Sequence, residues 1–271
     1  MKRWLAALLV LPLLTFALAG RAETPKEAYA AALAALAKGA DNEAIDRLEL
    51  LADQGVVHAD ASLARAAAYL ARAEGSGARP GDLGRASAAL SEALVLRPSD
   101  ARAERALDAV QSEIARRHSK HGESVLVRPR LSRAIAALLP EQVWAVLALL
   151  GASVVTLGIV LRRLASRPLL RLSGVVAMSV GGVLTLAFAG GAYASEHFRV
   201  TSQPAVVVVP EAHLTNETGR PLPRGRGADT SSVPEGATVY VLERRDGRCR
   251  VEWGSSDGWL GLSELRVLAS R

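Results

Sequence analysis

Residues 143–161 read VWAVLALLGASVVTLGIVL and residues 172–194 read LSGVVAMSVGGVLTLAFAGGAYA, and neither stretch contains a charged residue. At about 1.5 Å per helical residue, each is long enough to cross the roughly 30 Å hydrocarbon core of a bilayer. A buried hairpin of a soluble protein would normally carry a polar stripe, which neither stretch has. Both are rich in Gly, Ala and Ser, which lets membrane helices pack closely. We therefore predict two transmembrane helices, Val143–Leu161 and Leu172–Ala194.

The connection between these two stretches, residues 162–171, sets their expected orientation. It carries no acidic residue and four basic ones, namely Arg162, Arg163, Arg167 and Arg171. Short positively charged loops stay on the cytoplasmic side of a membrane. Three arginines before the first span, at positions 128, 130 and 133, compete with this signal, but the loop is flanked by spans on both sides. We expect a cytoplasmic loop and two flanking regions outside the cytoplasm.

The N-terminal segment 1–22 has the composition of a secretory signal peptide. Two basic residues precede an apolar run over residues 4–18, and small residues follow it. Cleavage after Ala19 or after Ala22 fits this pattern, and an uncleaved anchor helix is the alternative. A cleaved signal requires the region that follows to lie outside the cytoplasm, which agrees with the orientation expected from the arginines.

The net charge of the chain reflects export and membrane topology rather than nucleic-acid binding. Of 271 residues, 33 are Lys or Arg and 27 are Asp or Glu, which leaves a formal charge of +6. Five of the six excess charges fall in segment 1–22 and in residues 134–198. The regions outside them are close to neutral, so no domain has the basic surface of a nucleic-acid-binding protein. One Cys also excludes a disulfide scaffold and Cys-rich metal sites.

The region 23–118 is dominated by residues that favour helix. We predict five helices, over residues 25–38, 41–54, 57–74, 82–96 and 99–118. The segment 82–98, DLGRASAALSEALVLRP, resembles the second helix of a tetratricopeptide repeat, where small and large residues alternate on the packed face and Pro closes the unit. The positions that carry the resemblance are Ala86, Leu90, Ala93, Leu94, Leu96 and Pro98. A weaker match involves Ala44, Leu48 and Leu51.

Repeat arrays of this kind bind proteins or peptides in the groove lined by their first helices. The resemblance implies that Lys26, Tyr29 and Leu33 lie in such a groove, and the alternative is that they only pack or face solvent. His118 and His121 have a metal-like spacing. Without a third ligand they are better explained as a solvated helix end, so no metal site is expected. Residues 119–142 form an Arg-rich linker to the first span.

The C-terminal region 200–271 changes to short strands. We predict strands at 205–209, 238–243, 248–253, 258–260 and 265–268, with a tight hairpin turn at Asp246-Gly247. The order VPEG, VYVLE, DGRCRV, DGWL resembles the bacterial SH3 domain and implies a small all-β barrel. Cys249 is expected to be a buried apolar residue rather than a redox thiol. Trp253 and Trp259 are either core residues or part of a binding surface.

The chain contains none of the sequence patterns of a catalytic centre. There is no nucleophile elbow, phosphate-binding loop or HExxH motif. We therefore expect neither an enzyme nor a cofactor. The expected architecture is a multidomain membrane protein with an all-α tetratricopeptide-like repeat, two transmembrane helices and a small SH3-like barrel.

This order of parts resembles the BatE-like proteins of bacterial aerotolerance (Bat) operons. The resemblance implies an accessory protein of the bacterial plasma (inner) membrane, with its N-terminal and C-terminal domains outside the cytoplasm. It also implies partners among envelope proteins, namely membrane-anchored von Willebrand A-domain proteins of a MoxR-ATPase system, and a role in aerotolerance or envelope stress.

Three hypotheses for function follow. The first is a non-enzymatic scaffold in the lipid bilayer for protein–protein interaction. The second is a peptidoglycan-binding tether or wall sensor that acts through the SH3-like domain. The third is a subunit of an envelope enzyme whose active site lies on a partner.

Overall fold

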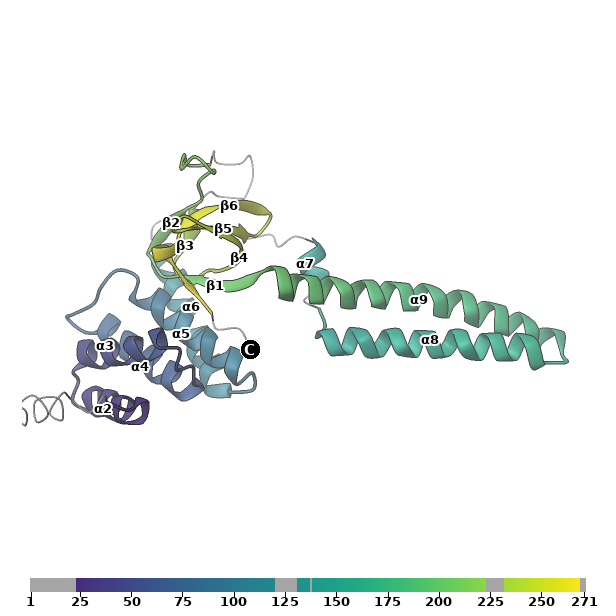
Figure 1. The fold of residues 1–271 in the computed structure, drawn as a ribbon, viewed down its shortest axis with the longest axis horizontal. Coiled ribbons are helices and arrows are strands. Elements are labelled where there is room, and N and C mark those ends of the chain that lie inside the picture. The colour runs from purple at the N-terminus through teal and green to yellow at the C-terminus, as the bar shows by residue number, and fades with distance from the viewer. Residues whose placement is uncertain (1–22, 120–130, 137, 223–231, 269–271) are drawn as a thin grey trace, which may run out of the picture.

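The computed structural model describes residues 23–119, 131–136, 138–222 and 232–268. The chain is mostly helical and carries one small antiparallel sheet of five strands. Two long apolar helices, α8 (Glu141–Leu164) and α9 (Pro168–Thr201), form a hairpin that projects away from the rest of the molecule (Figure 1). We call helices α2–α6 the helical layer, strands β1–β7 the β domain, and the two together the head. The expected signal segment 1–22 lies outside the described residues.

The helical layer has helices at Pro25–Ala37 (α2), Asp41–Asp53 (α3), Ala59–Glu74 (α4), Asp82–Leu96 (α5) and Ala101–Ser119 (α6). Each boundary lies within two residues of the range expected from the sequence. Consecutive helices pack side by side. The positions singled out for their repeat-like spacing are mostly buried: Ala44, Leu48, Leu51, Ala86, Leu90 and Ala93 are at most 2% exposed. Leu94 and Leu96 are half-buried and Pro98 is exposed.

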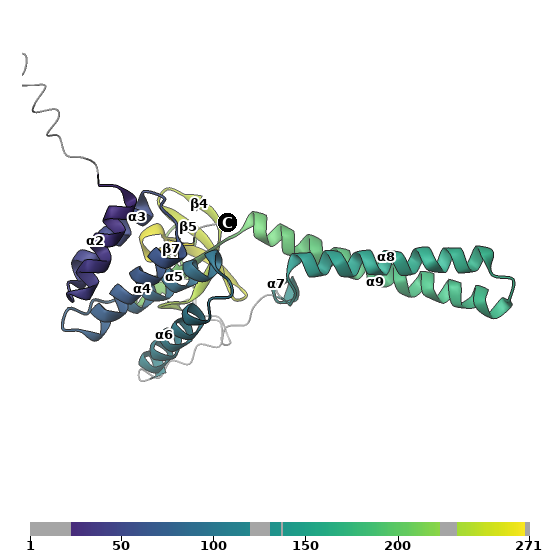
Figure 2. The same ribbon diagram turned by 90° about the horizontal axis from the view of Figure 1, so that it is seen from below.

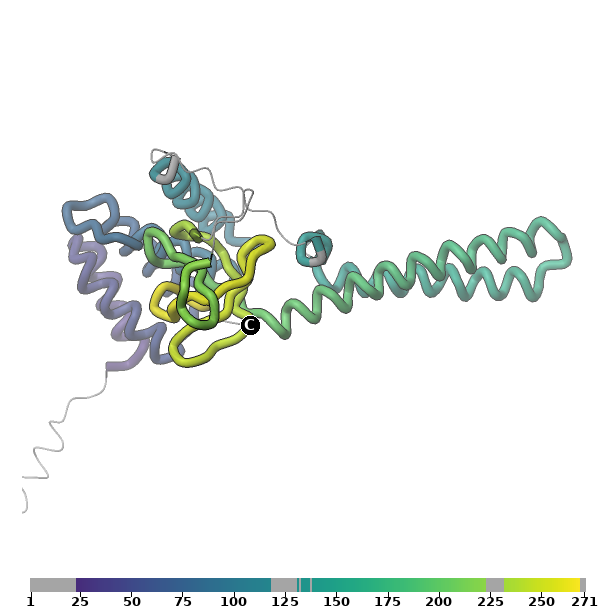
Figure 3. The backbone as a smooth tube through the Cα atoms, turned by 90° about the horizontal axis from the view of Figure 1, so that it is seen from above, coloured from purple at the N-terminus to yellow at the C-terminus, as the bar shows by residue number. Residues whose placement is uncertain are grey.

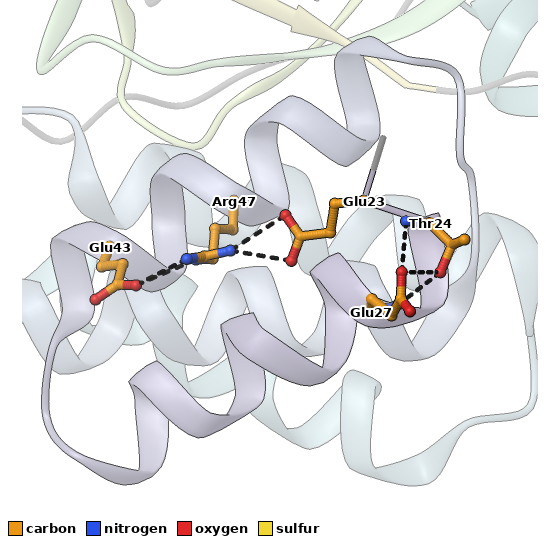
Figure 4. Close-up of polar contacts among 5 residues, drawn as sticks. All are labelled: Glu23, Thr24, Glu27, Glu43 and Arg47. Carbon is orange, nitrogen blue, oxygen red and sulfur yellow. Dashed lines mark hydrogen bonds and ion pairs between the residues drawn. The ribbon is translucent and has the colours of Figure 1, made fainter. Parts of the chain in front are cut away.

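Polar contacts hold the first helix in place (Figure 4). Thr24 and Glu27 form a capping box at the start of α2, in which each side chain accepts a hydrogen bond from the other residue's backbone N–H. Such a cap satisfies N–H groups that have no partner within the helix. Arg47 of α3 forms ion pairs with Glu43 and with Glu23, which precedes α2. The pair with Glu23 joins the beginning of α2 to α3.

The β domain has strands at Gln203–Val207 (β1), Glu211–His213 (β2), Ser232–Pro234 (β3), Thr238–Arg245 (β4), Arg248–Trp253 (β5), Ser256–Gly261 (β6) and Leu265–Val267 (β7). A 3-10 turn, η1, covers Leu262–Glu264. The main sheet has the order β6-β5-β4-β1-β7, and β2 pairs with β3 in a separate ribbon.

The expected closed barrel is wrong, because the sheet is open. The outer strands are β6, which pairs with β5, and β7, which pairs with β1; beyond β6, the described residues have only an isolated bridge between Trp259 and Thr215. The main core lies on one face of the sheet, where side chains from β1, β4 and β5 pack with Ala212, Leu214 and Val233 of the ribbon side. The opposite face of β1 packs on a helix instead of on further strands. A sheet whose faces are covered in this way needs no closure to bury its apolar residues.

The hairpin consists of α8, Glu141–Leu164, and α9, Pro168–Thr201. Their 24 and 34 residues correspond to lengths of about 36 Å and 51 Å. A short helix, α7 (Leu131–Ala136), packs against α9 near the head. One residue, Ser202, separates the end of α9 from β1, so the hairpin runs directly into the sheet (Figures 1 and 3).

The connection between the two long helices is shorter than expected. It consists of Ala165, Ser166 and Arg167, because Arg162 and Arg163 continue α8 and Arg171 lies in the first turn of α9. Arg171 also donates a hydrogen bond of 2.9 Å from its Nε to the carbonyl oxygen of Ala165. All four arginines remain exposed at the end of the hairpin that lies farthest from the head (Figure 2).

Candidate functional site

The central feature of the head is the contact between its two parts, which are separated in the chain by the hairpin. Strand β1 takes part with both of its faces. Ala205 and Val207 point into the core of the β domain. Val206 and Val208 pack against Ala88 of α5. Because alternate residues of a strand point to opposite faces, the run AVVV is buried on both sides. The β domain therefore contributes one face to a core shared with the helical layer.

The one glycine of α5, Gly84, allows the backbones to approach closely. At Gly84, an ideal Cβ would lie 2.7 Å from the carbonyl oxygen of Val207, so a side chain has no room. The backbone N–H of Gly84 donates a hydrogen bond of 2.6 Å to Oε1 of Glu235. This N–H lies in the first turn of α5, where a helix has unsatisfied donors and attracts negative charge. Glu235 thus caps α5 from across the contact.

The turn that follows β3 completes this contact. Gly236 has φ +73° and lies against α6, since an ideal Cβ there would be 2.6 Å from Cδ1 of Ile114. The same turn supplies Glu235, so two consecutive residues touch two different helices. Ser87 of α5 is 1% exposed beside this turn, and its hydroxyl is the only buried side-chain polar atom without a hydrogen-bond partner in the described part of the chain.

A charged network connects the helical layer with β7. Glu49 of α3 accepts a hydrogen bond of 2.9 Å from the hydroxyl of Tyr69 and forms an ion pair of 3.3 Å with Arg266 of β7. Arg65 of α4 pairs with Glu49 at 3.6 Å and with the buried carboxylate of Glu92. Burial and the charge of Glu49 raise the pKa of Tyr69, because both disfavour the phenolate. The hydroxyl therefore remains a donor at neutral pH.

A small cavity of about 180 Å³ lies beside this network. It is lined by residues of both parts of the head, among them Arg85, Ser263 and Arg266. Its lining has three arginines and one glutamate, and each arginine forms an ion pair with a carboxylate outside the lining: Arg65 with Glu92, Arg85 with Asp82 and Arg266 with Asp53. We assign it to the packing of the two parts.

The junction between head and hairpin is built around Arg133 of α7. Its guanidinium forms an ion pair of 2.8 Å with Glu252 of β5. It also lies 3.7 Å from the ring centroid of Tyr240 and 4.5 Å from that of Phe198 at the end of α9. A planar guanidinium suits both contacts at once. The side chains of Arg133 and Glu252 are 12% and 4% exposed, so the pair is largely removed from water.

The two long helices pack through a row of glycines. Gly151 and Gly158 of α8 face Gly181 and Gly174 of α9, and an ideal Cβ at any of the four would lie 3.0 Å or less from the opposite helix. Trp144 covers Gly191 at the end nearest the head. The spacing of seven residues keeps one face of each helix in contact with the other. The opposite faces remain apolar and exposed, as at Leu149 (69%) and Leu186 (77%).

The residues predicted to line a binding groove lie on α2. Lys26 is exposed and Leu33 is 41% exposed. Tyr29 is half-buried and packs against the cluster around Leu48. These three side chains share one helix, but the β domain contacts α5, with further contacts to α3 and α6. The α2 surface is therefore separate from the contact within the head.

The two tryptophans of the β domain differ in position. Trp253 is 5% exposed and belongs to the core, so it offers no surface to a partner. Trp259 is half-buried on β6, and the guanidinium of Arg248 lies 5.9 Å from its ring centroid. A cavity of about 240 Å³ beside Trp259 is lined by Glu217, Arg245, Asp246 and Arg248.

Cys249 is a buried thiol in the core of the β domain. Cys249 is 0% exposed in the core, as expected, and burial raises the pKa of its thiol. Such a thiol is a poor nucleophile. His118 lies near the end of α6, and His121 lies outside the described residues. Among the described residues, no three His, Cys, Asp or Glu side chains gather where they could hold a metal ion.

The contact between the two parts of the head was not predicted, although the sequence holds one signal for it. A half-buried strand alternates apolar and polar residues, as β5 does. Residues 205–209 instead form a continuous apolar run, AVVVV, which is typical of a strand covered on both faces. The identity of the covering element cannot be read from that run, because α5 lies more than a hundred residues earlier in the chain.

Comparisons with protein-family models, with curated proteins and with solved structures gave no match.

Proposed function

We propose that this chain is a non-enzymatic scaffold, anchored in a membrane by α8 and α9, that presents the head for protein–protein interaction. In this proposal the helical layer is a degenerate tetratricopeptide-like array, the β domain is of the bacterial SH3 type, and the chain acts as BatE-like proteins do. The observation that carries it is the hydrogen bond from Gly84 to Glu235 and the packing around it. Two parts that flank a pair of apolar helices form one head.

Membrane insertion is supported by what the hairpin leaves uncovered. Both helices are long and apolar enough to cross a bilayer. Most of their large apolar side chains are exposed, whereas a core helix of a soluble protein would bury them. Residues 142–161 and 172–195 contain no charge, and 20 residues of helix span about 30 Å. Glu141 and Arg199 form an ion pair of 2.9 Å at the end of this zone nearest the head. The arginine-rich turn lies at the other end.

The proposed orientation is supported by one structural observation and one sequence pattern. Because the two parts of the head touch, they lie on the same side of the membrane, and a two-helix hairpin satisfies this requirement. The four arginines at the turn favour the cytoplasmic side for that end. The head then lies outside the cytoplasm of a bacterial plasma membrane, where its partners are envelope proteins.

Cysteine labelling tests this arrangement in the full chain. In a Cys249→Ala background, Ser166→Cys places a thiol in the exposed turn and Asp246→Cys places one on the head. A membrane-impermeant maleimide added to intact spheroplasts is expected to label position 246 and to reach position 166 only after lysis. Labelling of position 166 in intact spheroplasts would refute the orientation, and equal labelling of both would refute the spans.

Photocrosslinking tests the interaction surface on α2. A photoreactive amino acid at Leu33 is compared with one at Leu50, an exposed leucine of α3 (58%). In native membranes we expect a discrete adduct with an envelope protein from position 33 and none from position 50. Adducts of equal yield from both positions would contradict a specific surface on α2.

Wall binding is the second candidate, and the half-buried Trp259 beside a polar cavity favours it. The test uses the full chain in detergent, because an isolated β domain would expose Val206 and Val208. We expect the chain to remain in the supernatant when purified sacculi are sedimented. Sedimentation that is lost in Trp259→Ala but kept in Arg250→Ala would instead assign the chain to peptidoglycan.

A further inference from the structure

Three exposed apolar side chains lie together just before the hairpin. Leu131 and Ile135 of α7 are 80% and 50% exposed, and Leu138, which follows the helix, is 71% exposed. Residues four apart share one face of a helix, so Leu131 and Ile135 point the same way. An apolar group of this kind, next to the start of α8, requires a cover.

The opposite side of α7 is fixed to the protein. Arg133 lies between Leu131 and Ile135 in the chain, two residues from each, and forms the ion pair with Glu252. Ala136 is 6% exposed, and its carbonyl oxygen accepts a hydrogen bond of 3.4 Å from Nε1 of Trp144. Because these contacts hold one side of α7 on β5, α8 and α9, the short helix cannot turn its apolar face inward.

This face lies next to the end of the uncharged zone. Pro140, two residues after Leu138, is the N-cap residue of α8. The next residue, Glu141, forms the ion pair with Arg199. Val143 (39%) and Val146 (55%), in the first turns of α8, are also exposed and apolar. The aromatic ring of Tyr193 is also exposed (71%) in this zone, where amphipathic rings are typical of the membrane–water boundary.

We propose that Leu131, Ile135 and Leu138 insert into the lipid leaflet nearest the head, and that α7 is an interfacial anchor. The inference rests on the proposed insertion of α8 and α9. The apolar face of α7 would enter the boundary between headgroups and acyl chains by about 5–10 Å. Since Arg133 ties α7 to the β domain, this contact sets the orientation of the whole head relative to the membrane surface.

Spin-label accessibility in the full chain tests the inference. In the Cys249→Ala background, nitroxides are attached to Ile135→Cys or Leu138→Cys, and the protein is placed in vesicles of phosphatidylethanolamine and phosphatidylglycerol. Two control positions are Leu149→Cys within α8 and Asp246→Cys on the head, whose side chain is 90% exposed. Collision with oxygen, which concentrates in lipid, is compared with collision with a water-soluble nickel chelate.

Labels at positions 135 and 138 are expected to favour oxygen over nickel, at a depth between those of positions 246 and 149. If both behave like position 246 while 149 favours oxygen, the spans are inserted and the interfacial anchor is refuted. If they are shielded from both reagents, protein rather than lipid covers α7, and the inference is again overturned. If 149 also favours nickel, the proposed insertion itself fails.

Discussion

The backbone N–H of Gly84 and the carboxylate of Glu235 are 151 positions apart in sequence and joined by a hydrogen bond of 2.6 Å. One residue precedes the apolar hairpin and the other follows it. A scaffold that displayed two independent modules would not need this contact. The helical layer and the β domain instead share buried contacts within one head, and α8 and α9 form the connection between them.

The close approach at Gly84 predicts a large effect of one methyl group. In Gly84→Ala, the Cβ would lie 2.7 Å from the carbonyl oxygen of Val207 and 2.8 Å from Cγ of Glu235. Overpacking of this kind lowers the free energy of unfolding by roughly 1–3 kcal/mol. Gly77→Ala is the matched control, since its nearest neighbour, Cγ of Arg72, would be 3.8 Å away. Thermal unfolding of the full chain in detergent measures both, and equal melting temperatures would contradict a tight contact.

Removal of Arg133 is expected to loosen the junction between head and hairpin. Arg133→Met leaves the 4% exposed carboxylate of Glu252 without its guanidinium partner, and loss of one member of a buried pair costs roughly 3 kcal/mol. The stability of Arg133→Lys should lie between that of the unmodified chain and that of Arg133→Met, because an ammonium group cannot stack between Tyr240 and Phe198 as a planar group does. Denaturation followed by tryptophan fluorescence measures the effect.

The control for this prediction is an exposed pair in the same domain. Arg250 lies 3.5 Å from Asp257, with side chains 46% and 26% exposed. Arg250→Met should change stability by less than about 0.5 kcal/mol, as surface pairs usually do. Equal effects of the two Met variants would show that Arg133 contributes no more than a surface charge.

The glycine row in the hairpin predicts a position-specific effect. In Gly158→Ile the new Cβ would lie 2.7 Å from the carbonyl oxygen of Gly174, which forces the helices apart and costs roughly 1–3 kcal/mol. Gly182→Ile adds the same side chain to α9 where nothing lies within 4 Å, and is expected to be nearly neutral. Loss of helicity during titration with sodium dodecyl sulfate reports the difference. If Gly158→Ile lost its helicity at a higher detergent concentration than Gly182→Ile, the packing of the glycine row would be refuted.

Buried Cys249 predicts a loss of stability at alkaline pH. Burial raises the pKa of this thiol in the folded state, whereas the pKa of a thiol in an unfolded chain is about 8.5. Above that pH the unfolded state loses a proton that the folded state keeps, so the free energy of unfolding falls as pH rises. The contribution is fully present below the unfolded pKa. Cys249→Ala should have a smaller alkaline slope in denaturant titrations, and an unchanged slope would exclude this thiol as the cause.

Local sequence was sufficient for the elements of the helical layer. Each of the five helices begins and ends within two residues of its expected range, because the signals are short-range. Gly39, for example, follows α2 with φ +71°, a conformation that glycine adopts without penalty. The Asp246-Gly247 turn likewise has φ values of +49° and +74° and joins β4 to β5 as expected.

Local sequence was insufficient where an element ends for reasons outside its own composition. The expected connection of ten residues shrank to three because charged residues continue a helix as readily as apolar ones do, and arginine favours helix. The two tryptophans of the β domain are a second example. Both lie in strands, and only the pairing of β5 with β6 places Trp253 in the core and leaves Trp259 half-buried.

The sequence by itself determined the five helices of the helical layer, the five strands of the main sheet and the apolar hairpin, since caps, turns and periodicity act over a few residues. Helix α7 and strands β2 and β3 were not predicted. Only the tertiary structure decided that the sheet stays open and that the helical layer and the β domain form one head. The physical reason is that the second face of β1 is buried by Ala88 of α5, more than a hundred residues away in the chain. An apolar run records that a strand is covered on both faces, but the covering surface exists only once the chain has folded.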